Sequence, residues 1–195
     1  MIGLVAGLIL FLGVHLSRVV APEFRATTIA TRGDGVWKGI YTAASLVGFG
    51  LIIWFYGDAV ANGPYLYEPP VWAKHINALL MLFASISMGV YLFPAGRLKP
   101  ALKHPMLLAV KIWALGHLLA NGSLAAILLF GSFLAWAVVV RIALKKREQR
   151  GEASLPVAGP IKWDLFAVVA GLIIYVVFVG WLHLWLFGVA PISAS

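Results

Sequence analysis

The chain has 195 residues, of which 62% are hydrophobic and only 11% are charged. A soluble domain of this length carries about a quarter charged residues, so the apolar excess is too large for one ordinary core. A lipid bilayer must supply the apolar solvent, and the sequence predicts an integral membrane protein. Because cysteine is absent, disulfides, thiolate metal sites, iron–sulfur clusters and cysteine nucleophiles are excluded.

Six apolar stretches, taken in chain order, predict the membrane-spanning helices. A helix needs about 20 apolar residues to cross a bilayer, so the fourth stretch is marginal. Only the pair Asn121-Gly122, which is typical of a turn, separates it from the fifth. The stretches are residues 2–20, 37–57, 73–93, 105–120, 123–142 and 163–188. We therefore expect an all-α, polytopic transmembrane bundle of about six helices, with residues 1–195 forming a single integral membrane domain.

The segments between these stretches differ in character. The first stretch lacks the basic start and the cleavage site of a secretory signal, so it is expected to be a retained helix. Residues 21–35 predict a short helix lying in the membrane interface. Residues 56–70 contain several Tyr and Pro residues and predict an ordered cap at the outer interface. Residues 145–160 form the most polar segment and predict a mobile cytoplasmic connector.

The cations indicate the orientation in the membrane. Every Lys and Arg except Lys74 and Lys111 lies on or beside the first, third or fifth connection. Positive loops stay in the cytoplasm, so the odd connections are predicted inside and both termini outside. The net charge of +8 is explained by this pattern, and no nucleic-acid partner is expected. The expected surroundings are the lipid bilayer.

The intramembrane histidines are the candidates for chemistry, because ionisable groups in spans are costly and usually functional. Imidazole is a common haem ligand, and two histidines from facing helices can hold one haem. Each of them could instead serve as an interhelical hydrogen-bonding group. His75, His117 and His183 are predicted near the outer face, whereas His15 is predicted nearer the cytoplasm. His104 precedes a proline and is expected to be a helix cap or an interfacial residue.

Lys111 is the remaining intramembrane ionisable residue. A central lysine costs about 2.5 to 3.5 kcal/mol on insertion scales. Two orientations remain open for it, into the bundle toward an acceptor or along the helix toward the cytoplasm. No HExxH spacing occurs, so a zinc hydrolase is not supported.

Several separated motifs carry a resemblance to a known family. The segment KHPMLLAVKIWALGHLLANG, the opening LFLGVHLSRV and the segment AKHINALLMLFASISMGVYLFP resemble the NnrU family of bacterial membrane proteins. That family is associated with denitrification, through functional nitrite and nitric oxide reductases. It includes the plant 15-cis-zeta-carotene isomerase, a haem b membrane enzyme. The resemblance implies a multi-pass protein of the bacterial inner (cytoplasmic) membrane.

The resemblance also implies a cofactor site. Its haem ligands match His15 and His117, and the cofactor expected is haem b. Ala114 stands where the plant enzymes have cysteine, a difference that weighs against carotene itself as the substrate. The leading hypothesis is a haem b protein that serves denitrification. One alternative is a haem-dependent cis-trans isomerase of a polyene lipid, which would have an apolar small molecule as its partner. The other is a cofactor-free assembly factor. A homo-oligomer is compatible with each of these functions. The wider set of expected cofactor contacts is His75, His183, Arg18, Arg25, Arg32, Trp113 and Asn121, with the arginines serving the haem propionates.

Overall fold

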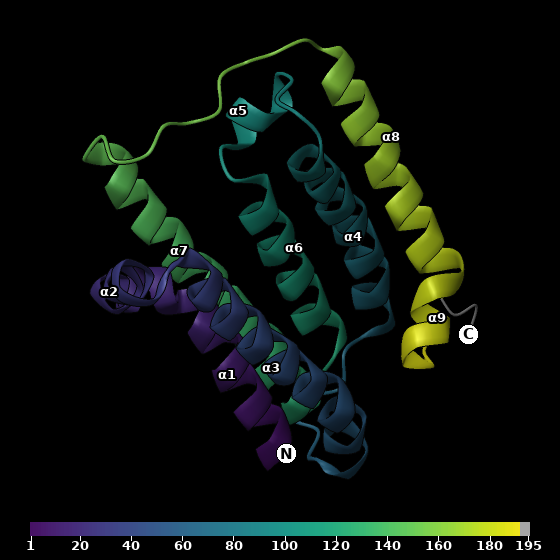
Figure 1. Ribbon diagram of the computed structural model, residues 1–195. Coiled ribbons are helices and arrows are strands. Elements are labelled where there is room, and N and C mark those ends of the chain that lie inside the picture. Colours follow the sequence, from purple (N-terminus) through teal and green to yellow (C-terminus); the bar gives the residue numbers. More distant parts are fainter. Residues whose placement is uncertain (192–195) are drawn as a thin grey trace. The chain divides into compact units, whose positions relative to one another are not determined.

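The structure is a computed structural model that describes residues 1–191. Those residues are mostly helical and contain no strand longer than an isolated bridge, which confirms the all-α prediction (Figure 1). A π-helical turn interrupts the last long helix. In chain order the elements are α1 (Ile2–Val20), α2 (Pro22–Arg32), α3 (Asp34–Asn62), α4 (Val71–Leu92), α5 (Leu98–Leu102), α6 (Pro105–Ala120), α7 (Leu124–Gln149), α8 (Lys162–Val177), the π-turn η1 (Phe178–Leu182) and α9 (His183–Phe187).

The predicted spans correspond closely to these helices. Among residues 1–191, five helical runs are long and apolar enough to cross a membrane, namely α1, α3, α4, α7 and the continuous run Lys162–Phe187. The sixth predicted span is α6, which is apolar but has only 16 residues. The structure therefore supports a polytopic membrane protein with about six helices. The short helix predicted after the first span is also present, as α2.

The predicted connector at residues 145–160 is wrong in its first part, because α7 continues through Lys145 to Gln149. Lys, Arg, Glu and Gln are all good helix formers, so polarity alone does not end a helix. Tertiary contacts of Glu148, described below, also hold this turn. The helix ends near Gly151, whose φ of +73° favours glycine.

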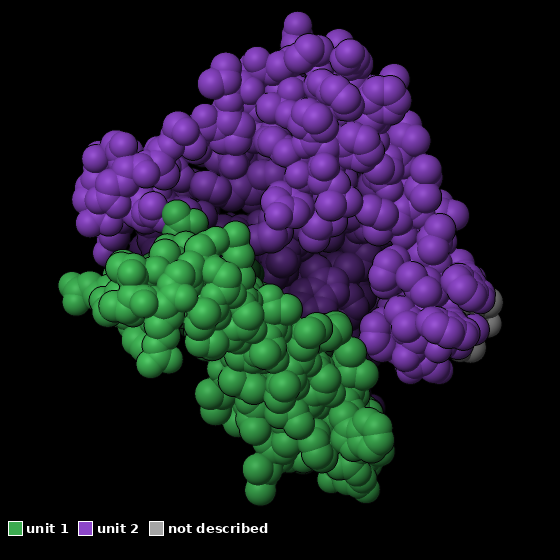
Figure 2. Space-filling model, viewed as in Figure 1, with its two compact units in different colours: residues 1–67, 122–136 green, residues 68–121, 137–195 purple. Residues whose placement is uncertain are grey.

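The chain divides into two compact units, which are coloured separately in Figure 2. Unit 1 comprises residues 1–67 and 122–136, and unit 2 comprises residues 68–121 and the chain from 137 onward. Helix α7 contributes its first half to unit 1 and its second half to unit 2.

In unit 1, glycines allow α1 and α3 to pack closely. A Cβ at Gly7 would lie 2.9 Å from the backbone nitrogen of Ile52, and one at Gly48 would lie 2.7 Å from that of Phe11. Small residues at such positions let membrane helices approach until their backbones touch. The same antiparallel register brings His15 of α1 beside Tyr41 of α3.

The connection between α6 and α7 is held within unit 1 by residues 64–66. Leu66 donates its N–H to the Gly122 carbonyl at 2.8 Å, and Leu124 donates to the Pro64 carbonyl at 2.9 Å. A Cβ at position 122 would overlap the carbonyl oxygen of Tyr67, so only glycine fits there. Asn121 is extended, with φ −137° and ψ 116°. The prediction of a turn at Asn121-Gly122 is therefore wrong. Glycine is required at position 122 because the Tyr67 carbonyl comes so close to it, and not because the backbone adopts an unusual φ there.

In unit 2, α4 packs against both α6 and α8 (Figure 1). A Cβ at Gly89 of α4 would meet the backbone carbonyl of Ala167 in α8. On the other side of α4, the buried hydroxyl of Ser87 donates to the Pro105 carbonyl at 2.8 Å, where α6 begins. These contacts position α6, which carries His117.

Candidate functional site

His117 lies in the last turn of α6 and is oriented by its own helix. Its Nδ1 donates to the carbonyl of Trp113 at 2.9 Å. The side-chain amide of Asn121 donates to the His117 carbonyl at 2.9 Å. A carbonyl only accepts, so Nδ1 carries the proton and Nε2 carries the lone pair in the neutral ring. This is the arrangement that metal-ligating histidines commonly show.

His183 begins α9, directly after the π-turn. Its Nδ1 donates to the carbonyl of Val189 at 2.8 Å. That carbonyl can reach back because α9 ends at Gly188, whose φ of +69° is one that L residues rarely adopt. The tautomer of His183 is thereby fixed in the same sense as that of His117, with the lone pair on Nε2.

The structure brings these two imidazoles together within unit 2. Their ring centroids are 6.5 Å apart and their planes differ by only 18°. Aromatic rings flank the pair: Trp113 lies 5.5 Å from His117, and Phe187 lies 4.9 Å from His183. Two imidazoles from helices distant in sequence thus share one apolar neighbourhood.

His15 lies in unit 1 and shows the same backbone arrangement. Its Nδ1 donates to the Phe11 carbonyl at 2.6 Å, which again leaves the lone pair on Nε2. The rings of Phe11, Tyr41 and Trp136 surround it at centroid distances of 4.3, 5.1 and 6.3 Å. The indole nitrogen of Trp136 is buried and has no hydrogen-bond partner among the described residues. His15 therefore occupies an aromatic cluster with a lone pair available for a ligand.

The other expected cofactor contacts lie in more open positions. His75 is exposed on the second turn of α4. Arg18 is exposed at the end of α1, while on α2 Arg25 is half-buried and Arg32 is exposed.

Lys111 is half-buried on α6, and no hydrogen bond or ion pair of its ammonium is found within residues 1–191.

His104 has a partner that the sequence did not suggest. It occupies the position before α6, but its side chain makes no capping hydrogen bond. Instead its Nε2 donates to Glu148 Oε1 at 2.5 Å, and Arg141 Nη1 lies 3.5 Å from the same oxygen. The hydrogen bond from His104 is the main cause that lowers the pKa of Glu148, which lies in the charged turn beyond the apolar part of α7. A separation of 44 residues hides this pair from any local pattern.

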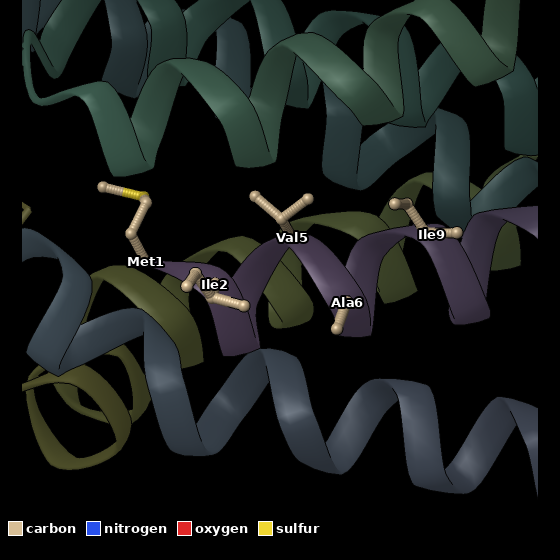
Figure 3. A pocket seen from close by; sticks show the side chains of 5 residues that line it. All are labelled: Met1, Ile2, Val5, Ala6 and Ile9. Carbon is tan, nitrogen blue, oxygen red and sulfur yellow. The ribbon is translucent and has the colours of Figure 1, made fainter.

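Two further findings concern a pocket on α1 and the grouping of metal-ligating side chains. Figure 3 shows a pocket on α1 lined by Met1, Ile2, Val5, Ala6 and Ile9, whose side chains carry no nitrogen or oxygen. Within residues 1–191, no group of three or more His, Asp or Glu side chains is placed to hold a metal ion.

The comparisons with known proteins identify the family of the chain. Neither a curated protein nor a solved structure matches the chain. A sequence model of the family described as NnrU protein matches residues 3–191, nearly the whole chain. With its apolar helices and its motifs around His15 and His117, the chain belongs to the NnrU protein family.

Proposed function

We propose that the protein binds haem b in the membrane, with His117 as an iron ligand, and that it supports the reduction of nitrite and nitric oxide. The observation that carries the proposal is the orientation of the His117 ring by the Trp113 carbonyl. A neutral imidazole held in this tautomer presents Nε2 to iron, and a backbone carbonyl on the other nitrogen raises its basicity.

The residues present fit a haem in three respects. Histidine is the ligand type that b-type haems use, and several histidines here carry their lone pair on Nε2. Aromatic and apolar side chains line their surroundings. Arg18, Arg25 and Arg32 supply cations near one end of the helices of unit 1, where propionates could pair with them. A bound haem b supplies a one-electron redox centre.

The first test is an absorption spectrum of the detergent-purified protein, oxidised and reduced. We expect a Soret band and reduced α and β bands, with about one haem per chain by pyridine haemochromogen assay. His117→Ala should lose most of the bound haem, because the remaining ligand gives far weaker binding; outer-sphere changes alone typically cost 10- to 100-fold in affinity. A wild-type protein that is well folded but holds no iron would contradict the proposal and favour a cofactor-free assembly factor.

The role in denitrification needs a separate test. A host strain that lacks this protein should consume nitrite and nitric oxide more slowly, and the wild-type chain should restore the rate while His117→Ala does not. Full restoration by His117→Ala would separate the physiological role from haem binding. Co-expression with a cis-carotene pathway tests the alternative isomerase activity, since changed isomer ratios in extracted lipids would favour it.

A further inference from the structure

We infer that unit 2 meets the two headgroup regions of one lipid bilayer at two levels that tryptophans mark. The first, called the Trp72 level, contains Trp72 of α4 and Trp185 of α9. The second, called the Trp163 level, contains Trp163 of α8 and Phe93, which directly follows α4. The partner is a bilayer with a hydrocarbon core of about 30 Å. The inference is independent of haem binding.

The two levels follow from the antiparallel packing of α4 against the last helix, the run Lys162–Phe187 (Figure 1). A Cβ at Gly89 of α4 would meet the Ala167 carbonyl of α8. Counting along both helices from this contact, at about 1.5 Å per residue, places Trp72 level with Trp185 to within about one turn. The same count toward the other end places Phe93 level with Trp163.

Apolar bands of similar length lie between the two levels on both helices. On the last helix no Asp, Glu, Lys, Arg or His occurs between Asp164 and His183, and on α4 none occurs after His75. In this register the two bands coincide from end to end. Their exposed side chains include Phe83 at 52% and Ile173 at 57% exposure. Two exposed faces that are apolar over the same range require an apolar solvent.

Tryptophan and lysine side chains lie at the ends of these bands. Trp72, Trp181 and Trp185 are 59%, 61% and 67% exposed. At the other level the Lys162 ammonium lies 5.3 Å from the centroid of the Trp163 ring. Tryptophan is enriched at both membrane interfaces, where its ring lies among the headgroups, and lysine extends its charge to the same region. The residues at both levels therefore fit lipid headgroups.

The distance between the levels agrees with the thickness of one bilayer. From Trp163 to Trp185 a helix rises about 33 Å at 1.5 Å per residue, or about 31 Å across the membrane when it is tilted by 20°. The hydrocarbon core of a typical bilayer is about 30 Å thick. A single bilayer therefore fits between the two levels with little mismatch.

This placement gives depths to two residues of α6. A Cβ at Gly116 would meet side chains within residues 77–81 of α4, so His117 lies about 9 Å from the Trp72 level. Counting back along α6 places Lys111 about 15 Å from either level, near the middle of the bilayer. His117 is therefore closer to the headgroups at the Trp72 level than to those at the other. Lys111 lies at the depth where a lysine is most costly.

The test measures the depth of nitroxide spin labels in the full-length protein reconstituted in liposomes. Because the chain has no cysteine, single substitutions carry the label. Leu165→Cys, Ile173→Cys and Leu184→Cys replace side chains of the last helix that are 64%, 57% and 52% exposed. The readout is the collision rate with oxygen, which concentrates in the bilayer centre, divided by that with a polar nickel chelate. We expect this ratio to be several-fold higher at Ile173→Cys than at the other two.

Matched positions on α4 repeat the measurement on a second helix. Phe83→Cys lies level with Ile173→Cys, and Leu92→Cys lies level with Leu165→Cys, so each pair should give the same ratio. The side chains replaced on α4 are 52% and 60% exposed. Ser154→Cys, at an exposed position in the connection before α8, is the control and should collide freely with the nickel chelate.

Each outcome supports or overturns the inference. Equal ratios within each pair, with the maxima at Ile173→Cys and Phe83→Cys, would establish the two levels. A maximum at Leu165→Cys or Leu184→Cys, or unequal ratios within the pairs, would overturn them. Low collision rates with both reagents at Ile173→Cys would show that protein, such as a second copy of the chain, covers this face instead of lipid. None of these readouts depends on iron, so their failure leaves the proposed function standing.

Discussion

The histidines show how a single side chain acquires a role from its own helix. His15 and His117 each donate Nδ1 to the carbonyl four residues earlier, at 2.6 and 2.9 Å. This contact requires only helical geometry, so the tautomer follows from the sequence position. The aromatic rings beside each imidazole, in contrast, come from residues far along the chain, such as Tyr41 and Trp136 beside His15. His104 shows the contrast, because its Nε2 is engaged in a hydrogen bond with Glu148.

The close approach of α8 to Gly89 of α4 predicts the effect of a single substitution on stability. Gly89→Ala should destabilise the protein by about 1 to 3 kcal/mol, the usual cost of inserting a methyl group into a packed site. The added Cβ would meet the Ala167 carbonyl and lie 3.0 Å from the Gly171 nitrogen, and backbone atoms cannot rotate away. The measurement is the free energy of unfolding in mixed detergent–denaturant micelles.

The matched control for Gly89→Ala is Gly50→Ala. A Cβ at Gly50 meets nothing within 4 Å, and alanine is the better helix former by about 1 kcal/mol. This variant should be neutral or slightly stabilising. Equal destabilisation by the two substitutions would contradict the packing role of Gly89.

At the scale of elements, the end of α7 depends on a contact between helices. Its last turn contains Lys146 and Arg147, whose like charges repel each other. Glu148 offsets that repulsion through His104 and Arg141. The helix therefore continues past its apolar residues because a side chain at the start of α6 holds it.

Glu148→Gln should loosen this turn. The amide cannot form the charge-assisted hydrogen bond with His104, so amide hydrogen exchange across residues 143–150 should become several-fold faster. Acid should act in the same direction on wild type. Because the pKa of Glu148 is lowered from 4.5 in the folded protein, its contribution is fully present above that value and is lost as the pH falls through the lowered one.

Glu152→Gln is the control for this turn. Glu152 also pairs with arginines, Arg147 at 3.5 Å and Arg150 at 3.0 Å, but its side chain is 45% exposed. Exposed pairs contribute little, so exchange across the same residues should change little. Equal acceleration in both glutamine variants would show that net charge, and not the His104 contact, holds the turn.

At the scale of the whole molecule, the orientation in the membrane remains a prediction from the cations. The natural absence of cysteine makes it directly testable, because each introduced cysteine is the sole thiol. Ser154→Cys and Glu68→Cys place that thiol at exposed positions in two different connections. A membrane-impermeant maleimide should label Glu68→Cys in intact spheroplasts and Ser154→Cys only in inverted vesicles. The opposite pattern would place both termini in the cytoplasm.

The sequence by itself determined the fold class and, apart from the end of α7, the helix boundaries to within about five residues. It did so because hydropathy and length decide whether a helix can cross a bilayer, and both are local properties. The start of α6 at Pro105 follows from the proline itself, and its end at Ala120 follows from the Asn121-Gly122 pair directly after it. The sequence also singled out His117 and His15 as ligand candidates, with His75 and His183 as further cofactor contacts, and left Lys111 without a role.

Only the tertiary structure decided which of those side chains meet. The rings of His117 and His183 lie 6.5 Å apart, and His183 directly follows the π-turn, a feature that leaves no clear signal in an apolar sequence. The contact between His104 and Glu148 joins residues 44 positions apart. Local patterns fix what a segment can form, whereas packing between distant helices fixes what its side chains touch. That difference is why the sequence named the candidate ligands, and the structure showed which of their rings lie side by side.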